Sequence, residues 1–395
     1  MFAPSCGIVI LVKFYLSRQL RFCGAVILFE RGYRRRILLC AASVSGRSVF
    51  ADGPQRAEIE KEENSVFLKL KSNFQKKPSR FYAMSIAATW AGAGSFIVGT
   101  QIAQQDGLVP WLLWALGNTL CCVIFGLLAD TFPRLRSVAK SKPVQLLMGL
   151  MCIFQIWVNM NGVYEMLAPT VIGSKTARII VYAVSAFFVL FYLKRATFRN
   201  VATDNGSWLA VYLLIAALVA YSMLTEGVHP IPTVPTMPAV RSKAWLCFTL
   251  AFGSFFYPTF WELLDYNDAN PDGTKTVNMR CAFVRGGLLF GAYLLFVLAG
   301  AFTIYSPAVE LLKGVLVSLV AVSSLSSFLY GAMVNFGKKL GVLVDAAAIG
   351  LWQFLVPMGV MGVWTLMQNI RIWMVLAMFA AALIWHLRDR KGARA

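Results

Sequence analysis

Two apolar stretches of the chain carry residues that interrupt a helix near its middle. The first contains Gly-Ala-Gly-Ser at Gly92–Ser95, and the second contains Gly-Ser-Phe-Phe-Tyr-Pro at Gly253–Pro258. An interior glycine costs a helix about 1 kcal/mol relative to alanine, and proline removes a backbone hydrogen bond. Within a membrane, backbone groups freed in this way are tolerated only where they line a cavity or are buried in protein. These two segments are therefore the first candidates for binding a polar ligand.

Each interruption alone is more often a packing feature, because glycine and proline are common in membrane helices. Interruptions at matched places in two halves of a chain, however, are the best sequence indication of a transporter's binding site. Aromatic side chains beside the breaks can stack on a solute, although packing is their more common role. The substrate-binding candidates at the breaks are Gly92, Gly94, Ser95, Ser254, Tyr257 and Trp261, with Trp90 as a further aromatic neighbour.

Polar side chains within other apolar stretches are further candidates. Gln155 and Asn159 are one helical turn apart and share a face, so they can hydrogen-bond a solute or join two helices. The run Ser323–Ser327 offers adjacent hydroxyls, which can supply hard oxygen ligands to a sodium ion if they face the first break. Serines in a membrane helix also pack closely and bond to their own helix, and this alternative stays open.

Four acidic residues lie within or beside the apolar stretches: Glu165, Glu262, Asp265 and Asp345. A charge at the bilayer centre costs upwards of about 2.5 kcal/mol. Glu165 lies near the outer end of its stretch, so it can either act at a site or extend to the interface. Glu262 and Asp265 are expected in an inner vestibule or paired with Arg280 or Arg285. Asp345 is expected at the inner interface.

Composition indicates the solvent that these residues meet. Of 395 residues, 58% are hydrophobic and 14% are charged, and the mean hydropathy is +0.65. Soluble domains carry about 25% charged residues. Ten long apolar spans are expected near 82–103, 109–129, 144–168, 178–193, 207–224, 243–264, 281–304, 308–335, 342–365 and 370–387. Their unbroken hydrophobicity excludes barrel strands, so the sequence predicts an all-α, multi-pass membrane protein.

The loops predict its orientation. With the N-terminus inside, inner segments carry twenty Lys and Arg residues and outer segments carry six, Arg371 among them. Both termini are then cytoplasmic, and the protein is expected in the plasma or inner membrane. A loop with four prolines at 225–242 separates two five-span repeats, 81–224 and 243–387, of opposite topology. The sequence thus predicts a 5+5 inverted repeat with broken helices one and six, followed by a basic cytosolic tail at 388–395.

The segments before the first span are polar. Residues 1–50 form a basic extension, either a targeting segment or a disordered one, or they reflect a start assigned too early. Residues 51–80 pass from an acidic cluster to a basic one, as in a cytosolic amphipathic approach to the membrane.

The net charge of +19 lies mostly in loops, which favours anionic lipid and not nucleic acid as the partner. The cysteines and two histidines have no spacing suited to a disulfide framework, a zinc site or catalysis, so neither an enzyme nor a resident cofactor is expected.

The run Ser85–Gly107, with Ala-Ala-Thr-Trp followed by Gly-x-Gly-Ser-Phe and a later glycine, resembles the first core helix of the sodium:solute symporter family. That family has the five-plus-five fold shared with the leucine transporter. The resemblance covers about 25 residues well, extends loosely over Asn118–Arg136 and is weak elsewhere. The nucleobase-cation symporters share the fold, and Gly117 with Asn118 resembles them too. The sixth span departs from the family pattern, because Tyr257–Asp265 replaces its usual polar signature, and additional helices usual after the core are missing.

The resemblance implies a sodium site built from two carbonyls on the first core helix, and a carbonyl and two neighbouring hydroxyls on the eighth. By position these are Ala88, Ala91, Ser323, Ser326 and Ser327. The function expected is ion-coupled, sodium-dependent transport of a small polar organic solute by alternating access. Alternatives are a non-transporting sensor or scaffold with a transporter fold, and a channel. The solute and the oligomeric state are left open.

Overall fold

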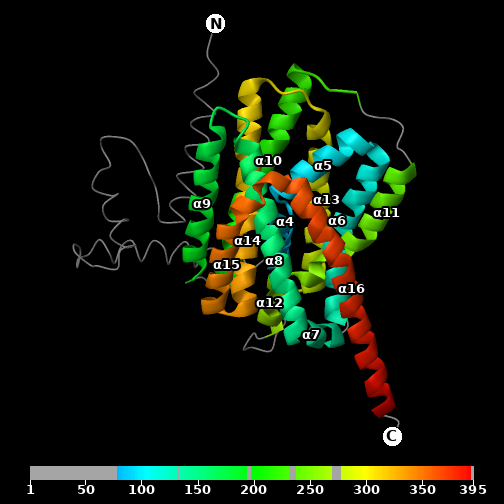
Figure 1. Ribbon diagram of the computed structural model, residues 1–395. Helices are drawn as coiled ribbons and strands as arrows, with labels where there is room; N and C mark the ends of the chain where they lie inside the picture. The colour runs from blue at the N-terminus through cyan, green and yellow to red at the C-terminus, as the bar shows by residue number, and fades with distance from the viewer. Residues whose placement is uncertain (1–77, 132, 194–196, 231–236, 269–276, 393–395) are drawn as a thin grey trace, which may run out of the picture. The chain divides into compact units, whose positions relative to one another are not determined.

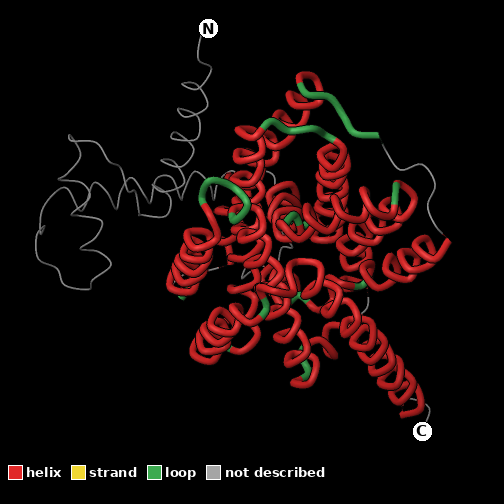
Figure 2. The backbone as a smooth tube through the Cα atoms, turned by 45° about the horizontal axis from the view of Figure 1, so that its top comes forward, coloured by secondary structure: helices red, strands yellow, loops and turns green. Residues whose placement is uncertain are grey.

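The computed structural model describes residues 78–131, 133–193, 197–230, 237–268 and 277–392. The chain divides into two units, residues 1–76 and 77–395, and every described residue lies in the second unit. The described residues are almost entirely helical, and their only β-structure is one isolated bridge (Figures 1 and 2). The predictions made for residues 1–50, and for 51–80 up to residue 77, fall outside the described residues.

Thirteen α-helices and three short 3-10 turns follow one another along the described part of the chain. In order they are α4 Pro78–Trp90, α5 Ala93–Asp106, α6 Leu108–Thr131, α7 Pro133–Ala139, α8 Lys142–Leu167, α9 Gly173–Tyr192, α10 Thr197–Thr225, α11 Met237–Ala251, η1 Gly253–Phe256, α12 Pro258–Asp268, α13 Met279–Phe302, α14 Pro307–Phe336, α15 Lys338–Leu351, η2 Trp352–Phe354, η3 Val356–Met358 and α16 Gly359–Gly392. The predicted all-α class is confirmed for these residues.

Seven helices in the described residues are long and apolar enough to cross a membrane: α6, α8, α9, α10, α13, α14 and α16. The bent pair α4–α5, which turns by 62° at its break, makes an eighth if it counts as one span. Large apolar side chains on these helices are exposed, such as Leu213 at 57%, Leu295 at 59% and Trp373 at 72%. Water would not solvate such surfaces at an acceptable free energy, whereas lipid would. The chain is therefore a membrane-embedded helical protein.

The packing of the helices buries both broken segments at their interruptions. Helix α8 packs along α14, α6 packs on both α11 and α13, and α13 also packs on α4. Phe125 of α6 anchors the second broken segment, since its ring centroid lies 4.8 to 5.6 Å from those of Phe255, Phe260, Trp261 and Phe283. Rings at these separations in tilted or edge-on contact add stability beyond their buried area.

The predicted bounds of the last two spans are wrong. The structure interrupts the helix at η2 and η3, over Trp352–Met358, where a continuous span at 342–365 was expected. Pro357 lacks a backbone donor, and Gly359 begins α16 with φ at +64°, a conformation that favours glycine. Helix α16 then runs without a break to Gly392, through the outer loop expected between 365 and 370. Its candidate membrane span is Val356–Trp385.

Two polar residues of α8 hold this turn. Asn161 accepts a hydrogen bond from the Trp352 indole at 2.8 Å and donates one to the Leu355 carbonyl at 3.2 Å. The Glu165 carboxylate accepts the Val360 N–H at 2.6 Å. That carboxylate caps the N-terminus of α16, where a negative charge is stabilising. Glu165 and Asn161 therefore join helices and fix where α16 begins.

Candidate functional site

The first expected interruption is present between α4 and α5. Ala91 and Gly92 are not helical, because the Gly92 N–H bonds to the Trp90 carbonyl at 2.8 Å and not to Ala88. The Ser95 N–H bonds to Gly92 at 3.1 Å, where an unbroken helix would direct it to Ala91. The carbonyls of Ala88 and Ala91 thus lose their helical donors at the middle of this segment.

The second expected interruption is present between α11 and α12. Helix α11 ends at Ala251, a 3-10 turn spans Gly253–Phe256, and Pro258 begins α12. Proline suits the first position of a helix, since the N–H that it lacks would have no partner there. The Trp261 indole donates to the Phe255 carbonyl at 2.9 Å and so satisfies one of the backbone groups released by the break.

The two interruptions meet at Trp90. A Cβ atom on Gly253 would lie 3.4 Å from Trp90 Cη2, so the backbone of the second break lies directly against this ring. The Trp90 ring centroid is also 6.3 Å from that of Tyr257 and 6.4 Å from that of Phe260. Each broken segment was predicted from its own residues, and their contact is what the structure adds.

A cavity opens beside the first break, among α4, α5, α6, α8, α11, α14 and α16. Its lining residues are Thr89, Trp90, Gly92, Gly94, Ser95, Trp114, Asn118, Gln155, Val158, Asn159, Leu250, Ser324, Phe328, Trp364, Gln368 and Arg371. The space among these side chains is about 420 Å³ when it is counted out to the mouth, and the centre of a water molecule reaches about 30 Å³ of it. A single water molecule needs about 10–15 Å³ by that measure, so this polar cavity has room for about two or three water molecules.

No protein-family model matches this chain, and no curated protein does. The function of the cavity is therefore argued from its own residues. Five of the predicted substrate-binding residues line it: Gly92, Gly94, Ser95, Gln155 and Asn159.

The other three predicted substrate-binding residues lie outside the cavity lining. Ser254 is fully buried, with its hydroxyl 3.9 Å from Cys122 Sγ. The Tyr257 ring packs 4.7 Å from that of Phe328, and Trp261 bonds to the backbone of its own break. The backbone of the second break thus borders the site, while these three side chains support it from behind.

The acceptor of Asn159 points at the first break. Its Nδ2 group donates to the Gln155 carbonyl at 2.9 Å, whereas Oδ1 is buried and has no hydrogen-bond partner among the described residues. A Cβ atom on Gly92 would lie only 2.5 Å from that Oδ1 and 3.2 Å from Ser324 Oγ. Position 92 therefore has to be glycine for α8 and α14 to approach the break this closely.

The hydroxyl that reaches the first break belongs to Ser324, which sequence reasoning did not select. Ser324 Oγ donates to the released Ala88 carbonyl at 3.1 Å. Ser326 instead donates to the Ser323 carbonyl at 2.7 Å and accepts from the Tyr192 hydroxyl at 3.1 Å, so it faces α9. Ser323 Oγ and Ser327 Oγ are buried and have no partner among the described residues. Ala88 and the serine run are thus adjacent, with Ser324 making the contact.

Two polar residues of α16 complete the lining. From the sequence, one was expected in the outer loop and the other was counted among the charges beside that loop. Gln368 and Arg371 are 5% and 2% exposed, and both face the cavity together with Trp364. The three positions follow a spacing of four and then three residues, which places them on one helical face. That spacing was the sequence signal that could have identified them.

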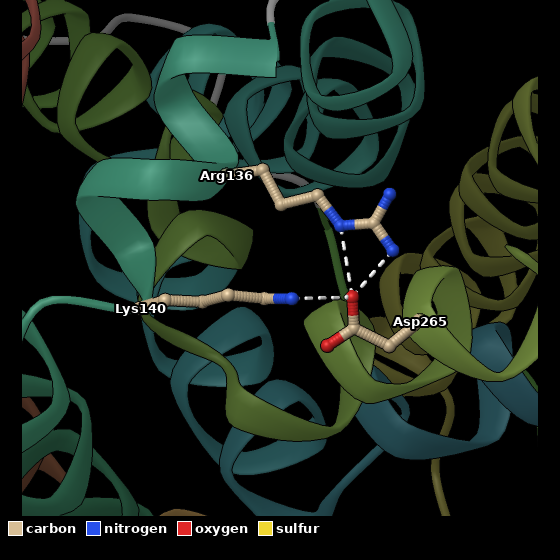
Figure 3. A network of polar contacts seen from close by, with 3 residues as sticks. All are labelled: Arg136, Lys140 and Asp265. Atoms are coloured by element: carbon tan, nitrogen blue, oxygen red, sulfur yellow. Dashed lines mark hydrogen bonds and ion pairs between the residues drawn. The ribbon is translucent and has the colours of Figure 1, made fainter. Parts of the chain in front are cut away.

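Ion pairs lie on either side of the second break. Before the break, Lys243 of α11 lies 3.2 Å from Asp106 at the end of α5. After it, Asp265 of α12 binds Arg136 Nε at 2.8 Å and Lys140 Nζ at 3.0 Å (Figure 3). The expected pairing of Asp265 with Arg280 or Arg285 is wrong. Helix α7 supplies Arg136, and Lys140 follows directly after it, so Asp265 joins α12 to the connection between α6 and α8.

The remaining acids are placed differently from one another. Glu262 accepts a hydrogen bond from the Tyr330 hydroxyl at 2.7 Å. Asp345 is fully buried within the protein, in α15, and its expected position at the inner membrane interface stays a prediction. Neither carboxylate oxygen of Asp345 has a hydrogen-bond partner among the described residues.

Removing the two aspartate charges should change stability in opposite directions. We expect Asp345→Asn to raise the melting temperature in detergent at alkaline pH, because an ionised buried carboxylate without a partner destabilises the folded state. Asp265→Asn should lower the free energy of unfolding by at most about 1 kcal/mol, since that carboxylate is part-exposed and such ion pairs are weak. One kcal/mol corresponds to roughly 2–4 °C. A lower melting temperature for Asp345→Asn than for Asp265→Asn would contradict the assignment of Asp345 as unpaired.

Proposed function

We propose that this protein is a secondary transporter that carries a small polar organic solute across a membrane by alternating access. The observation that carries the proposal is the contact between two helix interruptions beside a small polar cavity. Broken helices with freed backbone groups at membrane depth are the binding device of secondary transporters. The membrane-embedded fold, the buried polar lining and the small size of the cavity are all consistent with a site for one small solute.

The proposal includes a 5+5 inverted repeat, and matched helix contacts support it. If α4–α5, α6, α8, α9 and α10 form one repeat, then α11–α12, α13, α14, α15 and α16 form the other. The pairing of α4 with α13 is then matched by that of α11 with α6, and α8 with α16 by α14 with α10. The packing of α8 on α15 likewise corresponds to that of α14 on α9. Exchanging the halves thus exchanges these contacts, as an inverted repeat requires.

Sodium is the proposed coupling ion. The released Ala88 carbonyl, the Ala91 carbonyl and the hydroxyls of α14 are hard oxygen ligands, the kind that an alkali cation prefers. Ser324 takes the place of Ser326 in the proposed ligand set, which then comprises Ala88, Ala91, Ser323, Ser324 and Ser327, since the Ser324 hydroxyl is beside Ala88 and that of Ser326 faces α9. Sodium held between α4 and α14 would stabilise one state of the carrier and thereby raise its affinity for the solute.

The ion pairs on the two sides of the second break suit the same mechanism. Lys243–Asp106 ties α11 to α5, and Asp265 ties α12 to the α6–α8 connection. Two such ties, one at each end of the second broken segment, suit a carrier whose helices part in turn during alternating access. Opening to either side would require one of these ties to separate, and part-exposed ion pairs are weak enough to do so.

The test is uptake by proteoliposomes that contain the full chain. Radiolabelled sugars, amino acids, nucleobases and organic acids are offered separately, with an inward sodium gradient, a proton gradient or neither. We expect one solute class to accumulate above its external concentration only while the sodium gradient lasts. Accumulation driven by protons alone would refute the sodium assignment and leave the carrier intact. Failure of every solute under every gradient would favour a scaffold, and non-saturable flux without accumulation would favour a channel.

A further inference from the structure

The guanidinium of Arg371 is a buried positive charge with no counter-ion among the described residues. The residue is 2% exposed, lines the cavity, and is the only charged residue in that lining. Its Nη2 group approaches only the thioether sulfur of Met367, at 3.5 Å, and its Nε has no hydrogen-bond partner among the described residues. Its remaining neighbours are the Trp90 ring, 6.0 Å from Cζ, and the backbone of the second break.

A second positive feature faces the same cavity. Helix α5 begins at the first break with Gly92 as its N-cap, and no side chain caps it. The first N–H groups of a helix have no partner within it, and the helix dipole adds partial positive charge there. Gly94 and Ser95, in the first turn of α5, both line the cavity. An arginine and a helix N-terminus thus meet in a space that no described acidic side chain lines.

Other polar groups of the lining are also unpartnered among the described residues. The indole N–H groups of Trp90 and Trp114 and both ends of the Gln368 amide lack hydrogen-bond partners. Each such buried group destabilises the empty protein, so a ligand that pairs with it gains affinity. Donors outnumber acceptors in this set, which favours a ligand rich in acceptor oxygens.

We infer that the solute is a small organic anion whose carboxylate binds Arg371. The inference rests on the proposed function for taking the cavity as the solute site, and it names the class of solute. A planar guanidinium pairs with both oxygens of a carboxylate, while the α5 N-terminus stabilises the same negative charge. Asn159 Oδ1 is free to accept a hydrogen bond from a hydroxyl on the solute. No described acidic side chain lines the cavity to pair with an ammonium group, which favours an anion over an amine.

The test is thermal stabilisation of the purified full chain, in sodium, by matched pairs of probes. L-Lactate and 3-hydroxybutyrate are each compared with the corresponding neutral primary amide, and chloride serves as an inorganic anion. We expect the carboxylates to stabilise the protein and the amides to have at least tenfold lower affinity. Equal stabilisation by the amides, none by either carboxylate, or the same stabilisation by chloride would each overturn the inference.

Variants test Arg371 itself. Arg371→Gln should weaken carboxylate binding about 30-fold or more, yet leave the melting temperature of the empty protein unchanged or higher, because it removes an unpaired charge. Arg371→Lys should keep part of the affinity. Arg178→Gln is the matched control, since that arginine is exposed on α9, 5.6 Å from the Tyr164 ring, and it should behave as wild type. If Arg371→Gln binds lactate as well as wild type does, the inference is wrong.

The outcomes for this inference and for transport are separable. Binding of lactate lost in Arg371→Gln, without flux of any solute, would refute the carrier proposal and support the anion site. Sodium-driven uptake of a neutral solute that Arg371→Gln leaves undiminished would refute the anion site and support the carrier.

Discussion

Gly92→Leu is expected to reduce solute uptake to the level of liposomes without protein. Even a Cβ atom at this position would lie 2.5 Å from Asn159 Oδ1 and 3.3 Å from Ser324 Cβ. The rest of a leucine side chain would occupy a cavity in which water reaches only about 30 Å³. The variant should also lose solute-dependent thermal stabilisation, because filling the cavity removes the binding site itself.

The matched control is Gly350→Leu. Gly350 lies on α15, where a Cβ atom would meet nothing within 4 Å, so this variant should transport and melt as wild type does. Overpacking at Gly92 is expected to destabilise the protein by about 1–3 kcal/mol, and size-exclusion chromatography and melting curves would show whether Gly92→Leu still folds. A folded Gly92→Leu protein that transports normally would place the solute path elsewhere.

Ser324→Ala is expected to raise the sodium concentration that half-saturates uptake by about 10- to 100-fold, the range found when a group supporting a metal site is removed. The reason is the hydrogen bond from Ser324 Oγ to the released Ala88 carbonyl, which joins α14 to the first break. Uptake measured against sodium at fixed solute would give the shift. Maximal uptake at saturating sodium should change much less.

Ser185→Ala is the control for that experiment. Ser185 is as deeply buried as Ser324, but its hydroxyl bonds to Val181 within its own helix at 2.7 Å. It should leave the sodium dependence unchanged. Ser326→Ala should also have a small effect on sodium dependence, because its hydroxyl faces Tyr192. A sodium response that survives in Ser324→Ala but is lost in Ser326→Ala with Ser327→Ala would restore the serine pair implied by the family resemblance.

The breaks were predictable because their causes are local. Glycine lowers helix stability wherever it lies, and Pro258 cannot donate a backbone hydrogen bond in any fold. A short run of residues in each segment therefore indicated where its helix is interrupted. The structure locates the breaks at the expected residues.

Side-chain partners were less predictable, because they depend on how helices rotate against one another. Neighbouring serines of a helix point about 100° apart, so the run at 323–327 did not indicate that Ser324 faces the break. Asp265 pairs with Arg136, which is 129 residues away in the chain. No local pattern distinguishes that partner from the nearer Arg280.

Arg371 was misassigned for a different reason. Arg371 was counted among the charges of the outer segments, although it lies within a continuous helix and lines a cavity. In a membrane protein, polar residues at helical spacing within an otherwise apolar stretch are equally consistent with a binding face.

The most direct test of the central claim is the accessibility of Ser95→Cys, in a chain without its native cysteines, to a membrane-impermeant thiol reagent added to either side of proteoliposomes. Ser95 lines the cavity at the first break. Alternating access predicts labelling from one side at a time, a change of side when sodium is removed, and protection by solute from both sides. Labelling from both sides at once regardless of sodium, or from neither side under any condition, would contradict it.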